Sequence, residues 1–294
     1  MASAQPSLAD FPREALLEWD RRHRVDYPWR REHDPYAVLV SEVMLQQTQA
    51  SRVGPIFLAF LGRFPDVTAL AAASRADVLR AWSGLGYHRR AVALHETARA
   101  IVRDHDAQIP STFDGLLALP GVGPYTAAAV ASIAFGEPVA AVDTNIRKVL
   151  ARAVLGAEPD EVRPKDVAAA ADVALSVEHP GDWNQALMNL GRTVCRPTPR
   201  CDACPLAPAC VFRARGRVGR RSGRSQTAFE GSLRQIRGAV VRALGVRAQT
   251  PVELARETGH DVAGIRAAIE ALSLDGIVEP ASRGRFRLPG DSDA

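Results

Sequence analysis

The sequence has little of what a membrane-embedded, secreted or β-rich protein would need. Aromatic residues make up only 6% of the chain, whereas alanine-rich runs recur, and this favours close-packed helices over a β-sandwich. The most apolar stretch, residues 126–135, is too short to cross a bilayer before Gly136, Glu137 and Pro138 interrupt it. The first eleven residues have neither the basic start nor the apolar run of a signal peptide. We therefore expect a cytoplasmic protein.

Cysteine is also scarce, and all of it lies in one short segment. The spacing is C-x5-C-x2-C-x5-C, formed by Cys195, Cys201, Cys204 and Cys210. In a reducing compartment a bound metal explains clustered cysteines better than disulfides do. Four thiolates suit either zinc or an iron–sulfur cluster, and the spacing alone leaves both open. Either group would hold together a loop too short to bury a core of its own.

Charge is distributed unevenly along a chain of ordinary composition. The 294 residues are 47% hydrophobic and 24% charged, as in a soluble globular protein of about two domains. Residues 1–210 carry 22 basic and 24 acidic side chains, and residues 211–294 carry 15 and 9. The net charge of +4 therefore resides in the C-terminal part, which favours a polyanionic partner for that part.

Helical periodicity dominates the first 210 residues, where no period-two strand is evident. Proline, glycine and aspartate punctuate the apolar segments, as expected at helix ends. The expected helices span residues 11–24, 36–48, 54–64, 75–83, 89–105, 113–119, 125–135, 144–155, 164–177 and 183–194.

The pattern changes after the cysteine segment. Residues 213–224 are rich in arginine and glycine without an apolar period, which predicts a basic linker. Three helices and then two short strands follow, a pattern that predicts a small winged-helix-like domain. The expected elements span residues 233–244, 252–258, 262–273, 276–280 and 285–288.

The string LPGVGPYTAAAV, residues 119–130, is the most informative motif. Gly121, Val122 and Gly123 form a turn after one helix, and Pro124 takes the favoured first position of the next. Glycine permits close backbone approach, and the free amides of a helix start, here including Thr126, suit a phosphate. A single glycine would mark an ordinary helix–helix turn. The whole string is typical of a helix-hairpin-helix, which binds the DNA backbone without reading sequence.

Two carboxylates flank this motif in the sequence. Glu42 lies in the apolar segment VLVSEVML, where burial would raise its pKa and suit it to act as a general acid. Asp143 precedes an expected helix and fits an ordinary helix N-cap. Glu42 alone fits the polar edge of an amphipathic helix about as well as a catalytic role, whereas for Asp143 alone the helix cap is the stronger interpretation. Their occurrence together around a DNA-backbone motif favours catalysis.

Five segments, taken in order, carry a resemblance to a known family. They are SEVMLQQTQ at 41–49, GLGY at 84–87, LPGVGPYTA at 119–127, VDTN at 142–145 and the cysteine segment. In this order they resemble the endonuclease III-like DNA glycosylases, and within them the adenine DNA glycosylases of the MutY type. Those enzymes remove adenine mispaired with 8-oxoguanine or guanine in base excision repair.

The resemblance covers about residues 10–212 and implies a mainly α, two-lobed helix-hairpin-helix glycosylase fold with a [4Fe–4S] cluster at the cysteines. The implied glycosylase domain spans residues 8–212. Its six-helix lobe covers about 36–140, and its cluster lobe covers about 8–35 and 141–212. A basic linker (213–230) and the winged-helix-like domain (231–290) follow. The implied partner is double-stranded DNA that carries a mispaired or 8-oxoguanine-containing base pair. The implied setting is a monomer in the cytoplasm, associated with the nucleoid.

The resemblance also implies roles for single residues. Glu42 matches the general acid that protonates the leaving adenine, and Asp143 matches the carboxylate that stabilises the cationic sugar. These roles agree with an oxocarbenium-like transition state, which needs one proton donor and one lasting negative charge. The other matches are Tyr125 and Asn145 lining the catalytic site, Trp29, Arg30 and Asn189 around the flipped base, and Gln46, Gln47 and Tyr87 at the duplex, where Gln47 and Tyr87 act as wedges.

Tyr125 stands where strand-cleaving relatives carry a lysine that forms a Schiff base. The chain has two lysines, Lys148 and Lys165, and neither lies at this turn. The comparison predicts a monofunctional glycosylase that leaves the abasic strand uncut.

The sequence departs from the family pattern in three places. The first cysteine gap is five residues where the pattern has six, so the loop must close differently. Asn189 stands where an acid usually lies near the adenine amino group. The winged-helix-like domain replaces the usual lesion-reading domain. In it residues 262–273 would be a recognition helix, although this segment carries Arg266 but also Glu270 and is followed by Asp275, and a purely structural cap fits nearly as well. On the expected wing Arg283, Arg285 and Arg287 favour phosphate contact, as do the linker arginines.

Two alternatives remain open. One is a related glycosylase that removes thymine or uracil opposite guanine. The other, of a different class, is a non-catalytic iron–sulfur DNA-binding regulator, which would have no need for Glu42 and Asp143 together.

Overall fold

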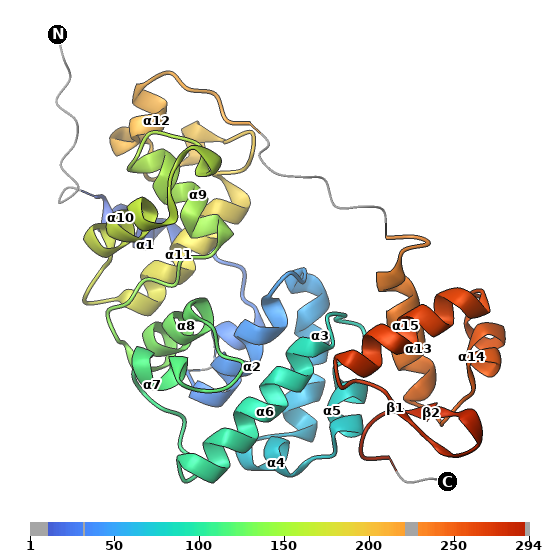
Figure 1. The fold of residues 1–294 in the computed structure, drawn as a ribbon. Helices are drawn as coiled ribbons and strands as arrows, with labels where there is room; N and C mark the ends of the chain where they lie inside the picture. Colours follow the sequence, from blue (N-terminus) through green and yellow to red (C-terminus); the bar gives the residue numbers. More distant parts are fainter. Residues whose placement is uncertain (1–10, 32, 221–228, 292–294) are drawn as a thin grey trace. The chain divides into compact units, whose positions relative to one another are not determined.

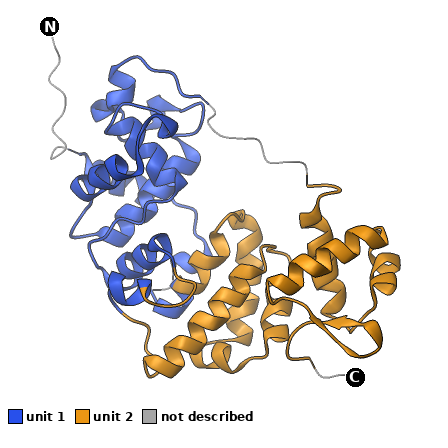
Figure 2. Ribbon diagram, viewed as in Figure 1, with its two compact units in different colours: residues 1–38, 111–117, 123–224 blue, residues 39–110, 118–122, 225–294 orange. Residues whose placement is uncertain are grey.

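The computed structural model describes residues 11–31, 33–220 and 229–291. Its helices form two compact units, each assembled from separate stretches of the chain (Figures 1 and 2). Unit 1 comprises residues 1–38, 111–117 and 123–224, and unit 2 comprises residues 39–110, 118–122 and 225–294. Residues far apart in the sequence therefore share one unit.

Unit 1 is helical and contains the cysteine segment. Its elements are α1 (Arg13–His23), η2 (Pro28–Arg30), the start of α2 (Pro35–Leu45), α7 (Phe113–Leu117), α8 (Pro124–Phe135), α9 (Thr144–Ala153), η3 (Pro159–Glu161), α10 (Pro164–Ala174), α11 (Pro180–Thr193), η4 (Cys201–Ala203), η5 (Ala207–Ala209) and α12 (Val211–Ala214). Helix α11 contributes Trp183, Leu187 and Leu190 to a core shared with Leu16 of α1 and Leu150 of α9. Because burial of these side chains stabilises the unit, α11 fixes the positions of the helices around it.

Unit 2 contains the end of α2 and two groups of helices. The first group is α3 (Ala50–Arg63), α4 (Val67–Ala72), α5 (Arg75–Ala81) and α6 (Arg89–Asp104). Trp82, fully buried after α5, meets Phe60 of α3 edge-on, with ring centroids 6.0 Å apart. This aromatic contact ties α3 to the turn between α5 and α6.

The second group, residues 229–291, is called the C-terminal module below. It consists of α13 (Leu233–Leu244), α14 (Pro251–Thr258), α15 (Val262–Leu274) and the antiparallel strands β1 (Glu279–Pro280) and β2 (Phe286–Arg287), with η6 (Ser282–Gly284) between them. A bridge from Gln249 to Phe286 adds a third short strand position. Three helices followed by a small hairpin are the expected winged-helix arrangement.

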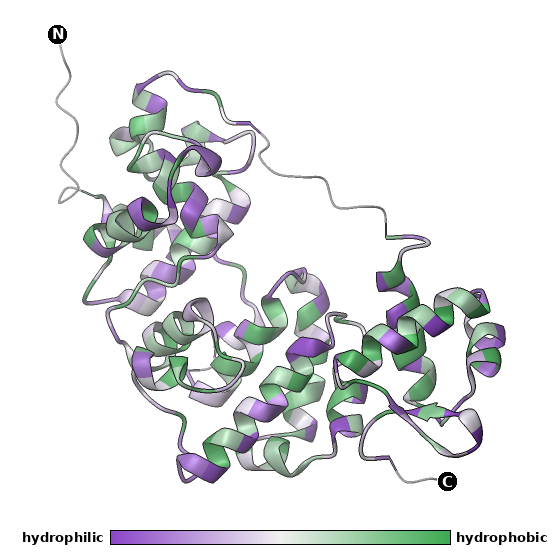
Figure 3. Ribbon diagram, viewed as in Figure 1, coloured by the Kyte–Doolittle hydropathy of each residue, from purple (hydrophilic) through white to green (hydrophobic). Residues whose placement is uncertain are grey.

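The expected helices are present, with ends displaced by a few residues, and the longer ones carry both hydrophilic and hydrophobic residues (Figure 3). Helix α4 was not expected: it is six residues long, and the Asp66 side chain caps it by accepting from the amide of Ala69. The units differ from the expected lobes, because α7 and α8 belong to unit 1 and the C-terminal module belongs to unit 2. Within the described ranges, no helix is both long and apolar enough to span a membrane.

Candidate active site and cysteine pocket

Asp143 is both a helix cap and a candidate catalytic group. Its Oδ1 accepts from the amides of Asn145 and Ile146, at 2.9 and 2.7 Å, at the start of α9. Its Oδ2 accepts from the Asn145 side-chain amide at 2.8 Å. Burial raises the pKa of Asp143, while these three donors favour its ionised form and oppose that rise. The cap therefore holds one carboxylate in a single orientation.

Helix α11 brings the neighbours of Asp143 together. Gly191 lies against Asn145 so closely that a Cβ at residue 191 would sit 2.6 Å from the Asn145 Cβ. Three residues earlier on the same helix, the Met188 sulfur lies 3.9 Å from the Tyr125 hydroxyl. Asn145 and Tyr125, both expected at the catalytic site, thus meet one helix. The sequence signal for Gly191 was weak, because glycine inside a helix has no single meaning.

The three residues expected around the flipped base gather near α1. Trp29 is buried and stacks on Tyr27, with ring centroids 4.7 Å apart. Asn189 is 1% exposed, and its amide nitrogen donates to Asp20 Oδ1 at 2.8 Å. Burial lowers the pKa of Arg30, and Asp20 is the charge that most opposes this change. The sequence reasoning missed Asp20, a buried carboxylate beside both Asn189 and Arg30.

Asn189 is not an open recognition group in this structure. Its side-chain oxygen accepts from Arg192 at 3.1 Å while its nitrogen serves Asp20. Both ends of the amide are therefore occupied by protein partners.

Glu42 lies in the part of α2 that belongs to unit 2. Its side chain is 6% exposed, between Ser41 and Val43, which are also buried. The apolar sequence around Glu42 predicted this burial.

Two loops of unit 2 carry the expected wedge residues, and Arg90 holds both loops. Gln47 and Tyr87 each adopt a positive φ, 54° and 47°, and both are exposed. Arg90 Nη1 donates to the carbonyls of Val43 (2.9 Å) and Met44 (3.1 Å), and also to that of Gln46.

The other terminal nitrogen of Arg90 serves the loop expected to carry the second wedge. Nη2 donates to the Thr48 hydroxyl at 3.0 Å and to the Gly86 carbonyl at 3.3 Å. The guanidinium also lies 5.3 Å from the Tyr87 ring centroid. Arg90 therefore joins the two wedge loops, a role that its sequence position did not reveal.

The glycines of the hairpin have different tasks. Gly121 has φ 81°, and a Cβ there would lie 2.9 Å from the Cβ of Ala93, so this glycine permits packing on α6. Gly123, the N-cap of α8, has open space around it. Val122 and Thr126 are buried, with the Thr126 side chain 2% exposed. Because Thr126 is buried, its hydroxyl is no candidate for a DNA contact, and the contact expected of its amide stays a prediction; open space at the turn lies at Gly123.

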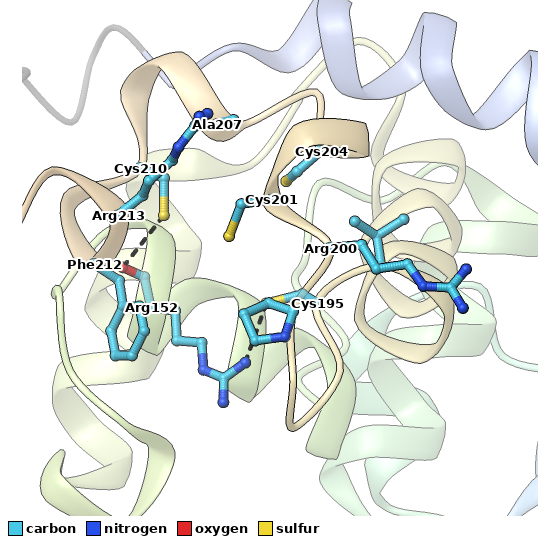
Figure 4. Close-up of a pocket in the computed structure, with 11 residues that line it drawn as sticks. Arg152, Cys195, Arg200, Cys201, Cys204, Ala207, Cys210, Phe212 and Arg213 are labelled. Atoms are coloured by element: carbon cyan, nitrogen blue, oxygen red, sulfur yellow. Dashed lines mark hydrogen bonds between the residues drawn. The ribbon is translucent and has the colours of Figure 1, made fainter. Parts of the chain in front are cut away.

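The four cysteines line one pocket of unit 1, as Figure 4 shows. Burial raises the pKa of the Cys204 thiol to about 12, and it also raises those of Cys195 and Cys210. Such thiols become thiolates only when a cationic group binds them. Within the described residues, no three His, Cys, Asp or Glu side chains are grouped closely enough to hold a single metal ion.

A buried ion pair lies next to the short segment between Cys195 and Cys201. Arg152 and Glu158 are 2% and 1% exposed, and Arg152 Nη2 lies 3.0 Å from both Glu158 oxygens. Arg152 Nη1 donates to the Arg196 carbonyl at 2.6 Å and to the Cys195 sulfur at 3.8 Å. Arg152 of α9 therefore holds the start of the loop of residues 196–200 through these hydrogen bonds.

Arginines that were expected to contact DNA are largely paired within the protein. In the linker, Arg217 bonds Glu161 at 2.8 Å and Arg220 bonds Asp160 at 3.1 Å. The first of these bonds helps to lower the pKa of Glu161 to about 2. The described part of the linker thus lies against unit 1, and the remainder of the expected linker, residues 221–228, falls outside the described residues.

On the wing, two of the three expected arginines are paired in the same way, whereas Arg283 is exposed. Arg285 pairs with Glu253 at 3.3 Å and Arg287 with Glu279 at 2.7 Å. The positive charge counted in the sequence is therefore compensated at most of the positions that we expected to face DNA.

Comparison with known proteins identifies the family of this chain. Residues 40–172 match the sequence model of the HhH-GPD superfamily base excision DNA repair proteins. An adenine DNA glycosylase of Mycolicibacterium smegmatis is 42% identical over 283 residues, which span 95% of this chain and 96% of that protein. The human adenine DNA glycosylase is 42% identical over 218 residues, 70% of this chain and 40% of its own. A solved thermostable thymine-DNA glycosylase, 28% identical, superposes with a TM-score of 0.67 over 72% of this chain and all of its own.

Proposed function

The chain belongs to the adenine DNA glycosylases of the HhH-GPD superfamily of base excision repair enzymes, and we propose that it hydrolyses the N-glycosidic bond of adenine mispaired with 8-oxoguanine or guanine. The proposal rests above all on Asp143, whose carboxylate is held by Asn145 and by the first amides of α9. An oxocarbenium-like transition state needs a lasting, fixed negative charge of this kind.

Glu42 supplies the proton in this proposal. A general acid must be protonated near neutral pH, and the proposal assigns this role to Glu42, which is buried in α2. Proton donation to the leaving adenine makes the base a better leaving group. Water then attacks the sugar carbon from which the base departs, and the carboxylate of Asp143 stabilises the positive charge on the sugar meanwhile.

We further propose that the enzyme leaves the DNA strand intact. Residue 125, at the start of α8, is a tyrosine whose hydroxyl lies against Met188, and it has no amine to form a Schiff base. Strand cleavage through a covalent sugar–enzyme intermediate therefore has no nucleophile at this position.

A [4Fe–4S] cluster is the proposed occupant of the cysteine pocket. Cys195, Cys201, Cys204 and Cys210 all line it, and no three of them are close enough together for a single ion. The choice of a cluster over zinc follows the resemblance to the endonuclease III-like glycosylases, because four cysteine thiolates suit either group. When bound, it would supply the cationic charge that keeps these buried thiols ionised.

Thymine or uracil opposite guanine is the second candidate substrate. It is supported by the likeness to the thymine-DNA glycosylase and by Asn189, which is engaged by Asp20 and Arg192.

One assay separates the two candidates. Purified protein is incubated with duplexes that pair A with 8-oxoguanine, A with G, T with G or U with G, and each sample is divided before alkali treatment. We expect breaks at adenine, only after alkali. Breaks at thymine or uracil alone would refute adenine as the substrate, and breaks without alkali would refute monofunctional chemistry.

Two variants assign the proton donor. Glu42→Gln should slow single-turnover excision by about 10²–10⁴-fold, the usual contribution of a general acid, while duplex binding is retained. The exposed Glu14→Gln is the matched control and should keep the wild-type rate.

Absorbance and metal content test the cluster. We expect a broad absorbance at about 400 nm together with bound iron and sulfide, whereas a colourless protein that contains zinc would contradict the proposal.

A further inference from the structure

The hairpin turn, residues 119–122, is attached to α6 by a hydroxyl group. Thr97 Oγ1 lies 2.7 Å from the Pro120 carbonyl oxygen and 2.8 Å from that of Ala93, one helical turn earlier. The Ala93 carbonyl already accepts a backbone amide inside α6, whereas in the described part of the chain no other protein group donates to the Pro120 carbonyl. Thr97 is 2% exposed, and a hydroxyl buried to this degree requires a hydrogen-bond partner. The bond therefore serves both the buried side chain and the turn.

The turn also packs directly on the backbone of α6. Gly121 has φ 81°, and a Cβ at this residue would lie 2.9 Å from the Ala93 Cβ and 3.2 Å from the Ala93 carbonyl oxygen. Glycine at residue 121 thus permits a close approach that a larger residue would prevent. The turn therefore meets α6 at two neighbouring points, Ala93 and Thr97.

The same face of α6 holds the two loops that are expected to enter the duplex. Arg90, Ala93 and Thr97 follow each other at spacings of three and four residues, so they share one face of the helix. As described above, Arg90 donates to carbonyls in the loops that carry Gln47 and Tyr87. A helix rises by about 1.5 Å per residue, so Arg90 and Thr97 stand about 10 Å apart along its axis. We call Arg90, Ala93 and Thr97 the α6 support face.

The backbone of these loops requires such support. Gln47 and Tyr87 have φ values of 54° and 47°, in the left-handed region that residues other than glycine occupy at a cost in free energy. They keep this conformation only where the surrounding structure fixes it. The α6 support face therefore holds two loops in conformations that their own residues do not favour, and it holds the hairpin turn beside them.

We propose that Thr97 is a positioning residue for DNA binding, whose hydroxyl keeps the hairpin turn at a fixed distance from the two wedge loops. The turn leads into Gly123 and the first amides of α8, which suit a phosphate. With turn and wedge loops held by one helix, the protein meets the duplex backbone in a preorganised form, and less free energy is lost in ordering the loops on binding. This inference rests on the proposed function in taking duplex DNA as the substrate.

The test compares full-length variants of residue 97 in binding to an undamaged duplex of about 30 base pairs. Thr97→Val removes the hydroxyl at similar size, and Thr97→Ser keeps it. We expect Thr97→Val to bind about three- to tenfold more weakly, the range for one lost hydrogen bond, and Thr97→Ser to bind within about twofold of the wild type. The slope of log K against log salt should stay the same in both variants, because the arginine and lysine contacts that release counterions are unchanged.

Thr258→Val on α14 is the matched control. The Thr258 hydroxyl donates to the Leu254 carbonyl at 2.7 Å, an equivalent bond to the residue four positions earlier, and this variant should bind DNA like the wild type. Urea unfolding of each variant measures any general loss of stability. If Thr97→Val does not fold, Thr97→Ala replaces it, because alanine also lacks the hydroxyl and favours a helix most.

Single-turnover excision separates positioning from chemistry. In Thr97→Val the protein concentration for half-saturation should rise as binding weakens, while the rate at saturation stays within about twofold, because Arg90 still holds the wedge loops. Wild-type affinity in the variants without the hydroxyl, or an equal loss in Thr97→Ser, would overturn the proposal. So would a slower saturated rate at unchanged half-saturation.

The binding assay is independent of adenine excision, because its duplex carries no mispair. If no adenine is excised but Thr97→Val still binds more weakly than Thr97→Ser, the proposed substrate fails and the role of Thr97 stands. If adenine is excised normally and the residue 97 variants all bind like the wild type, the role of Thr97 alone fails.

Discussion

Replacement of Arg90 tests whether the two wedge loops act as one unit. A lysine keeps the positive charge but offers its donors from a single atom, so it can serve one loop at a time. A glutamine removes the charge and reaches less far. Both variants break the link that Arg90 makes between the carbonyls of Val43 and Met44 and the loop that contains Gly86.

The size of the effect follows from the bonds that are lost. A hydrogen bond from a charged donor contributes about 1.5–3 kcal/mol, and removing one partner leaves the other polar groups unpaired. Neighbouring bonds from one guanidinium are not additive. We therefore expect Arg90→Gln to lower the free energy of unfolding by about 3 kcal/mol and Arg90→Lys by about half of that. Burial lowers the pKa of Arg90 to about 10, so the native side chain remains charged at neutral pH.

Urea unfolding measures the stability change, and single-turnover excision measures the functional one. We expect Arg90→Lys to slow excision about tenfold, which corresponds to about 1.4 kcal/mol of barrier. The rate defect of Arg90→Lys should be smaller when adenine lies opposite an abasic site, because a poorly stacked base needs less help to leave the duplex. If Arg90 had a purely structural role, the variant would slow excision from both duplexes by the same factor.

Two results would refute this reasoning. Wild-type stability and rate in Arg90→Lys would mean that the guanidinium bonds are dispensable. An equal rate defect on stacked and unstacked adenine would mean that Arg90 acts elsewhere than at the wedge loops.

Three further predictions concern other buried charges. Because burial raises the pKa of Asp143 while Asn145 opposes the rise, the acidic limb of the pH–rate profile should lie above pH 3.8, and Asn145→Ala should move it higher still. Glu158→Gln leaves Arg152 partly unpaired and should destabilise the protein by about 3–5 kcal/mol in urea unfolding; a change below about 1 kcal/mol would contradict it. His88, with a pKa of about 4 when folded and 6.5 when unfolded, is neutral in the native state, so stability should fall by about 3 kcal/mol as the pH drops from 6.5 to 4. This decline should be absent in His88→Gln.

Local sequence signals predicted the elements well. Pro124 after Gly123 marks the start of α8, and the Asp143 position marks the start of α9, because caps and first-turn prolines act within a few residues of chain. The two interpretations of Asp143 are compatible in the folded protein. The same bonds that cap the helix hold the carboxylate in one orientation, as the proposed catalytic role requires.

Such local signals did not predict which helices pack against each other. Arg90 contacts residues more than 40 positions away, Asp20 meets Asn189 across 169 residues, and Gly191 matters because of Asn145 on another helix. No local pattern encodes these pairings, since they depend on which helices meet and at which faces. The resemblance to a family supplied candidate residues without showing what holds them.

The sequence by itself determined the helices, the hairpin, the scarcity and clustering of cysteine and the excess of arginine after residue 210. Only the tertiary structure decided where that excess charge is effective. Arg217, Arg220, Arg285 and Arg287 are each paired with an acid that lies far from them or across a turn in the sequence. A charge count sums over the chain, whereas attraction for a polyanion depends on where the charges lie and on which acids they meet in the folded protein.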